Sequence, residues 1–142
     1  MATVTALDDA IDEIIDELQT ISGIRRVPDE PPEDNKAFPF AVVYSPSGIY
    51  EQIMTLEMRA LHNINIELHV ARQDLPRDYD KVMNLIDVIP YELMKKLKDG
   101  NFTALDTFGQ INYIFGPLSW GGVETLGVTY TIQNVKVKTA IT

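Results

Sequence analysis

The sequence predicts an α+β domain in which two helical segments pack on a mainly antiparallel β-sheet, in the order α-β-β-β-α-β-β. Three observations predict it: apolar residues at helical spacing near the N-terminus, alternating apolar and polar residues from Met54 to Val70, and a second helical segment before a β-rich C-terminal part. The chain has 142 residues, of which 45% are hydrophobic and 23% are charged. That size and composition predict one soluble domain over residues 1–142.

The first helix is expected over residues 5–21. Thr5 with Asp8 forms a capping-box start, and Gly23 is a plausible stop. Its polar face is acidic throughout, and like charges four residues apart cost about 0.2–0.5 kcal/mol each. Packing must therefore stabilise this helix, through an apolar stripe made of Leu7, Ile11, Ile14, Ile15, Leu18 and Ile21.

A polar, proline-rich loop is expected over residues 28–36, followed by a strand over residues 38–44 and a turn over residues 45–48. From Met54 to Val70 the even positions are then mostly apolar and the odd positions mostly polar, which is typical of a strand with one buried face. One strand of that length would span roughly 56 Å at ~3.3 Å per residue. The radius of gyration expected for this chain is only ~14–15 Å.

The chain is therefore expected either to bend within residues 49–59 or to project there as a β-arm or hairpin. An exposed apolar strand needs a neighbour to cover it. This stretch supplies most of the candidate oligomer-interface residues, and the aromatic side chain beside Gly121 supplies one more. The candidates are Ile49, Tyr50, Ile53, Met54, Leu56 and Trp120.

The second helical segment is expected over residues 78–98, with a kink or break caused by Pro90. Lysines at positions 95, 96 and 98 suit its C-terminal end. A strand near residues 110–115, a turn-rich link over residues 116–124 and a strand near residues 125–138 complete the expected order.

No catalytic, cofactor-binding or metal-binding residues are predicted. The chain has no cysteine, which excludes disulfides, thiolate metal sites and a cysteine nucleophile. His62 and His69 lie an odd number of positions apart on the alternating strand, so they point to opposite faces and cannot share a site. No phosphate-binding glycine motif occurs. The acidic helix face offers carboxylates to water rather than to a cleft. The protein is therefore not expected to be an enzyme.

The charge pattern bears on partners and location. The net charge is −9, and acidic residues are concentrated between Asp8 and Asp34. Duplex DNA binding depends mainly on Lys and Arg, so specific DNA binding is not expected. No apolar run is long enough for a membrane span, and the N-terminus does not look like a secretion signal. We expect folding in the cytoplasm, with no membrane partner.

Two stretches resemble a family of small tail proteins of siphophages, the tail-terminator or tail-completion (minor tail) proteins. Residues 61–78 resemble the central block of this family, an alternating strand that leads into a basic-acidic-Leu-Pro turn and a helix broken by proline, here at Pro90. Residues 114–128 resemble its closing hairpin.

The resemblance implies a structural virion protein at the head–tail joint of a long-tailed phage. It implies a homo-oligomeric ring, typically a hexamer, that ends the tail tube and docks to the head connector or neck protein, with double-stranded DNA passing through without specific binding. It implies no catalytic residue and no cofactor. Two alternatives stay open at this point: another head–tail joining or neck adaptor protein, and a cellular α+β module that binds a small ligand near Trp120.

Overall fold

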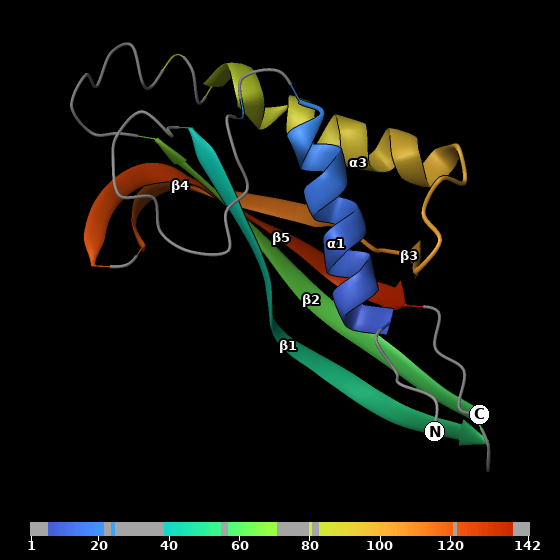
Figure 1. The fold of residues 1–142 in the computed structure, drawn as a ribbon. Helices are drawn as coiled ribbons and strands as arrows, with labels where there is room; N and C mark the ends of the chain where they lie inside the picture. Colours follow the sequence, from blue (N-terminus) through green and yellow to red (C-terminus); the bar gives the residue numbers. More distant parts are fainter. Residues whose placement is uncertain are drawn as a thin grey trace.

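The computed structural model describes residues 6–21, 24, 39–54, 57–70, 80, 83–120 and 122–137, without the side chains of residues 52–54, 57–59, 120 and 123. It is an α+β fold in which a curled antiparallel sheet carries two packed helices (Figure 1). The elements are α1 (Ala6–Gln19), β1 (Phe40–Met54), β2 (Glu57–Val70), α3 (Val88–Lys98), β3 (Leu105–Thr107), β4 (Ile111–Trp120) and β5 (Val123–Val137).

The sheet order places β1 and β4 on opposite edges. The strands follow the order β1-β2-β5-β3, and β4 also pairs with β5. Because β2 occupies one side of β5 over residues 126–136, β3 and β4 share the other side of β5. Every pairing is antiparallel. In the described part of the chain, β1 pairs only with β2, and β4 pairs only with β5.

The projecting hairpin expected from the alternation is present. β2 pairs with β1 from Glu57 onward, but its pairing with β5 begins only at Leu61. The tip of the β1–β2 hairpin therefore extends beyond the described part of β5 as a two-stranded ribbon, and it reaches past α1 at the lower right of Figure 1. A two-stranded ribbon is marginally stable in water on its own.

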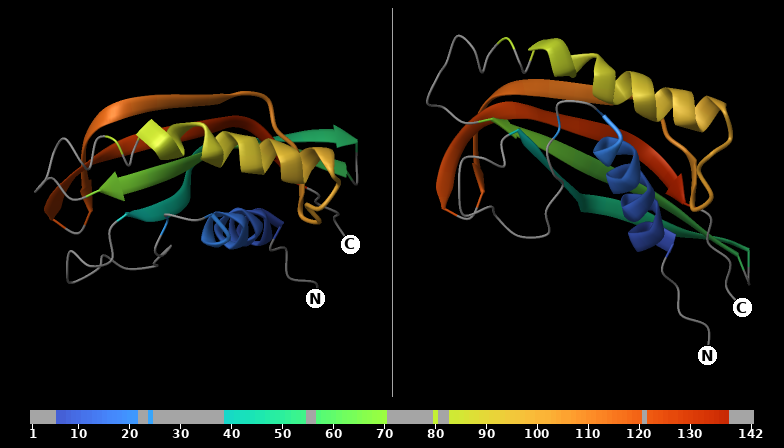
Figure 2. Two further views of the ribbon diagram at one scale, coloured as in Figure 1. Left: turned by 90° about the horizontal axis from the view of Figure 1, so that it is seen from above. Right: turned by 45° about the horizontal axis from the view of Figure 1, so that its top comes forward.

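The hydrophobic core lies between the sheet and the two helices, which cover one face of the sheet (Figure 2). The alternation along β2 is confirmed, because its even positions from Ala60 to Val70 are buried. They form one hydrophobic cluster with the buried stripe of α1, apolar residues of α3 and buried positions of β5. The core includes Ala10, Ile14, Leu18, Ile64, Ile66, Leu68, Ile89, Leu93, Val128, Tyr130 and Ile132.

The second helical segment is broken near Pro90, as predicted, and a side chain from β5 supplies the hydrogen bond that proline cannot make. A helical turn over residues 83–86 is separated from α3 by Asp87. Pro90 has no backbone N–H, so it cannot donate to the carbonyl of Ile86 four residues earlier. The buried hydroxyl of Tyr130 donates to that carbonyl oxygen instead, at 2.8 Å. Burial raises the pKa of Tyr130 well above its ordinary value, so the hydroxyl remains a donor.

The Tyr130→Phe variant is therefore expected to be less stable by about 1–3 kcal/mol, because the Ile86 carbonyl would be left without this donor. Urea denaturation at neutral pH measures the change. Tyr113→Phe is the matched control, since Tyr113 is exposed and should alter the free energy of unfolding little. Equal stability of the two variants would contradict this account of the break.

The N-terminal helix is fixed to the sheet by one carboxylate. The Glu13 side chain accepts hydrogen bonds from the backbone N–H groups of Thr103, Ala104 and Leu105 at 2.6, 2.7 and 3.1 Å. It also accepts one from the Thr103 hydroxyl. Burial raises the pKa of Glu13, but these hydrogen bonds outweigh burial and hold it below its ordinary value. The acidic face of α1 thus contributes a structural contact through Glu13.

Three details of the prediction were wrong. The order is α-β-β-α-β-β-β rather than α-β-β-β-α-β-β, since the strands expected on either side of residues 45–48 are the single strand β1. Those residues form no turn. They carry a register shift between Tyr44 and Ser47, where Ser45 and Ser47 both hydrogen-bond to Asn63. Cross-strand bonding thus keeps the chain in the sheet through a Ser-Pro-Ser-Gly sequence.

The C-terminal link was the second error, because residues 116–120 and 123–124 are strand rather than a turn-rich connection. The three-residue strand β3 was the third, since it was not predicted at all. The predicted Thr5 cap, Gly23 stop and loop over residues 28–36 lie outside the described residues. Within the described part of the chain, neither helix is both long and apolar enough to cross a membrane.

Candidate assembly surfaces

The first candidate surface lies on the projecting hairpin, and we define the hairpin surface as Ile49 and Tyr50. Their side chains are 60% and 61% exposed. Their register partners are Leu61 and Ala60, so strand alternation directs them to opposite faces of the ribbon. The hairpin therefore offers an apolar side chain on each face.

A buried histidine lies directly beside the hairpin surface. His62 pairs with Gly48, whose missing Cβ leaves room for the imidazole ring, and Tyr50 contacts that ring edge to face with centroids 5.3 Å apart. The ring is 3% exposed, and within the described part of the chain its Nε2 atom has no hydrogen-bond partner. An unsatisfied buried polar atom costs about 1–3 kcal/mol, so a polar group that bonded to this nitrogen would stabilise the hairpin.

The other predicted interface residues are only partly described. Ile53 and Met54 belong to β1, but their side chains lie outside the described residues, as does all of Leu56. Trp120 ends β4, and its side chain is likewise outside them. The structure therefore supports the exposed positions of Ile49 and Tyr50 and does not bring Trp120 to them, because β1 and β4 lie on opposite edges.

A second apolar surface lies on β4 and was not among the predicted candidates. We define the β4 surface as Tyr113, Ile114 and Phe115, of which Ile114 is the most exposed at 76%. The strand contains no acidic or basic residue. Natural edge strands are usually protected by charge, proline or a bulge, and Pro117 is the one such feature here. Exposed apolar residues on an edge strand are typical of a contact with another chain.

A polar network lies on the sheet face opposite the helices, across three strands. Glu67 accepts a hydrogen bond from the Tyr44 hydroxyl at 2.6 Å, and its other oxygen lies 2.9 Å from His69 Nε2. His69 Nδ1 lies 2.6 Å from the Thr125 hydroxyl oxygen, and the His69 ring stacks on Phe40. As expected, His62 and His69 point to opposite faces, so they share no site.

The tautomer of His69 follows from its neighbours. A carboxylate only accepts, so Nε2–H donates to Glu67 and the Thr125 hydroxyl donates to Nδ1. Burial lowers the pKa of His69, and the negative charge of Glu67 offsets this only in part. Hydroxyl, imidazole and carboxylate in this order resemble a nucleophile with its base. His69 is fully buried and Thr125 is 1% exposed, so a substrate could not reach them in this conformation. We assign the group a structural role.

The two histidines should make the fold sensitive to acid. Burial lowers both folded-state pKa values below the ordinary 6.5, so the unfolded chain binds more protons just below that pH. Stability is therefore complete above about pH 6.5 and falls as the pH is lowered from there. Thermal melting between about pH 7.5 and about pH 5 should show a falling melting temperature, with a smaller fall for His69→Gln. A melting temperature that rises on acidification would contradict this assignment.

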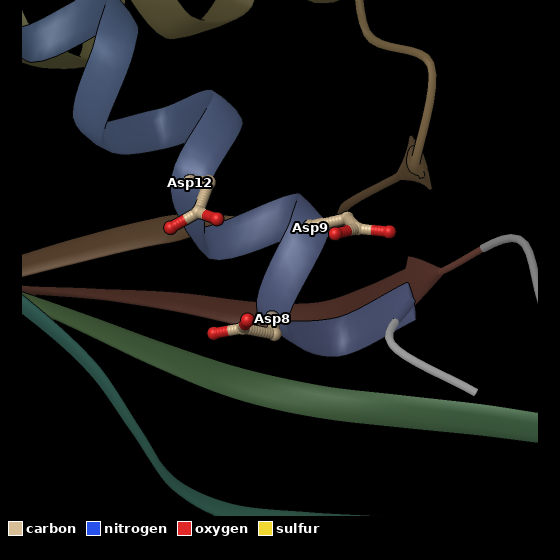
Figure 3. Close-up of side chains that lie close together, drawn as sticks. All are labelled: Asp8, Asp9 and Asp12. Atoms are coloured by element: carbon tan, nitrogen blue, oxygen red, sulfur yellow. The ribbon is translucent and has the colours of Figure 1, made fainter. Parts of the chain in front are cut away.

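Two further groups of polar side chains lie on or next to the helices. The carboxylates of Asp8, Asp9 and Asp12 lie within 4.8 Å of one another on the exposed side of α1 (Figure 3). All three side chains are exposed, and exposed acidic groups of this kind are common without an ion, so we do not assign a metal site to them. A shallow, open depression between α1 and α3 is lined by both acidic and basic side chains, which gives it no single ligand chemistry.

A scan against protein-family models and a search of curated proteins found no match to this chain. Assignment of a function therefore depends on the surfaces and charges described above, together with the resemblance noted in the sequence.

Proposed function

We propose that this protein is a structural virion subunit that assembles head to tail into a ring, hexameric as the resemblance implies. The ring would end the tail tube of a long-tailed phage and join it to the head connector. The observation that supports this most strongly is the presence of two exposed apolar surfaces on opposite edges of one sheet. A ring requires contacts of this kind, in which one patch of a subunit meets a different patch of the next.

The hairpin surface supports a contact with another chain in two ways. The core of one subunit leaves the Ile49 and Tyr50 side chains more than half exposed to water. A two-stranded ribbon is also marginally stable alone and gains stability when a neighbour packs against it. In addition, the buried Nε2 atom of His62 is left unsatisfied beside Tyr50. A polar group of an adjoining subunit could form a hydrogen bond with this atom, because buried polar atoms in proteins generally have a hydrogen-bond partner.

The charge supports a channel through which DNA passes without binding. A net charge of −9 gives phosphates little to bind, so DNA would not be retained in the ring by counterion release. A neck adaptor protein at the head–tail joint would also form a ring and could carry the same negative charge. Only the position of the ring in the virus particle distinguishes a neck adaptor from a tail terminator. The reading as a small-ligand module near Trp120 has no supporting observation among the described residues.

Negative-stain electron microscopy of the purified protein tests the proposal. Rings with a central opening are expected, together with weak binding of short DNA duplexes at physiological salt in a mobility-shift assay. Monomers without rings at all accessible concentrations would contradict the ring. Nanomolar duplex binding would contradict the channel.

A further inference from the structure

We define the free edge of β4 as its side away from β5, where no strand pairs with it among the described residues, and the sequence of β4 shows which residues face that side. Its pairing with β5 runs from Ile111 to Trp120 without a register shift. In an antiparallel pair, alternate residues exchange both backbone hydrogen bonds with the partner strand, and the residues between them point these groups away. Pro117 has no N–H and must occupy an outward position. Ile111 and Tyr113 share its parity, so their N–H and C=O groups also point away from β5.

A second contact agrees with this from Gln110 onward. Gln133 in β5 accepts from the N–H of Gly109 and donates its own N–H to the carbonyl of Gln110, both at 2.8 Å, so residues 109 and 110 lie opposite one residue of β5. Counting from Gln110, the even positions of β4 face β5. The odd positions of β4 therefore turn their backbone groups away from β5, toward the side on which no strand pairs with β4 in the described part of the chain. The N–H of Tyr113 is one of these outward donors.

We propose that β1 of a neighbouring copy of this chain pairs with the free edge of β4, so that one antiparallel sheet continues from subunit to subunit. This inference rests on the proposed ring. Three successive antiparallel pairings separate β1 from β4, so the two edge strands of one subunit run in opposite directions. When subunits repeat head to tail, β1 of the next subunit therefore meets β4 in the antiparallel sense.

The opposite directions of the two edge strands favour a second copy as the partner, and the charge pattern permits it. The chain is strongly acidic, so most pairs of surfaces on two copies repel each other. β4 has no acidic or basic residue, and Glu51 is the one charged residue of β1. These two edges are strips on which two copies can approach with little repulsion. Strand addition to a sheet edge supplies main-chain hydrogen bonds, and the exposed Ile49 and Ile114 side chains add apolar contact.

A proline substitution tests the backbone directly. Tyr113→Pro removes a backbone N–H that points away from β5, so the hydrogen bonds between β4 and β5 remain. Pro117 already lacks an N–H at an equivalent outward position. Tyr113→Val removes the same aromatic ring but keeps the N–H. We expect Tyr113→Val to assemble, and we expect Tyr113→Pro to remain monomeric with the circular dichroism of the folded protein. Normal assembly of Tyr113→Pro would overturn the proposal.

Cysteine cross-linking identifies the partner strand even if the proline variant fails to fold. The natural chain has no cysteine, so Ile49→Cys and Ile114→Cys each introduce one thiol, both on the sheet face opposite the helices. The two variants are expressed together and treated with a bismaleimide whose spacer covers neighbouring strand positions. We expect cross-linked dimers from the mixture and none from either variant alone.

The outcomes separate this proposal from the proposed function. Cross-linking of Ile114→Cys with itself would show a twofold β4 contact and overturn the pairing with β1. Intact rings without cross-links in the mixture would also overturn it, while the proposed ring would stand. Mixed cross-links in open filaments rather than rings would support the strand pairing and contradict the proposed function.

Discussion

Replacing Ile49 and Tyr50 together with lysine is expected to give a folded protein that no longer assembles. Both side chains are more than half exposed in the single subunit, so the free energy of unfolding should fall by little more than the roughly 0.5–1.5 kcal/mol of the Tyr50–His62 ring contact. In an assembly the same positions would be covered, and burying an unpaired charge there costs several kcal/mol per subunit. The affinity between subunits should fall by more than about 100-fold.

The matched control is Tyr91→Lys with Met94→Lys on α3. These side chains are 62% and 48% exposed, and the double change adds the same charge on α3 rather than on either candidate surface. Light scattering, with thermal melting of each variant, compares the two. If both double variants assemble, the hairpin surface has no role in assembly. If the Ile49 and Tyr50 variant unfolds, these residues belong to the core rather than to an interface.

Gly127→Ala is expected to prevent folding or to lower stability by well over 3 kcal/mol, beyond the usual cost of overpacking. Gly127 lies in β5 opposite His69, and a Cβ atom there would overlap the backbone carbonyl of Leu68 in the central strand β2. Backbone atoms of a central strand cannot move aside as a flexible side chain can. The substitution should therefore disrupt the β2–β5 pairing, which holds the two halves of the sheet together.

Gly116→Ala is the matched control for this prediction, because Gly116 is the register partner of Gly127 in β4. A Cβ atom at Gly116 meets no other atom within 4 Å. Soluble expression and denaturant unfolding of the two variants should therefore differ sharply. If Gly127→Ala folds with a stability close to that of Gly116→Ala, then β5 does not approach the Leu68 carbonyl of β2 as closely as described here.

The elements predicted best from the sequence are those with a sustained hydrophobic period. The alternation through β2 and the apolar stripe of α1 each reflect burial against one core, and such patterns are visible in a single chain. The break before α3 followed from Pro90, because a missing N–H acts locally. The hydroxyl of Tyr130 that compensates for it could not be predicted, since it comes from a strand far along the chain.

The errors arose where tertiary contacts override local signals. The Ser-Pro-Ser-Gly sequence favours a turn, but its bonds to Asn63 keep it within β1. Gly116 and Pro117 suggested a link, yet an outward position on an edge strand tolerates proline. The β4 surface was missed because a strand with apolar residues on both faces looks like a buried central strand, and only the sheet order shows β4 to be an edge.

Sedimentation velocity over a wide concentration range measures whether the subunits form a closed ring. Head-to-tail contact between two different edges of the sheet predicts one discrete closed species, with the mass of a hexamer if the resemblance holds. This species should persist on dilution, and it should be lost in the Ile49 and Tyr50 double variant. A monomer at every concentration, or a dimer that persists in that variant, would contradict the account.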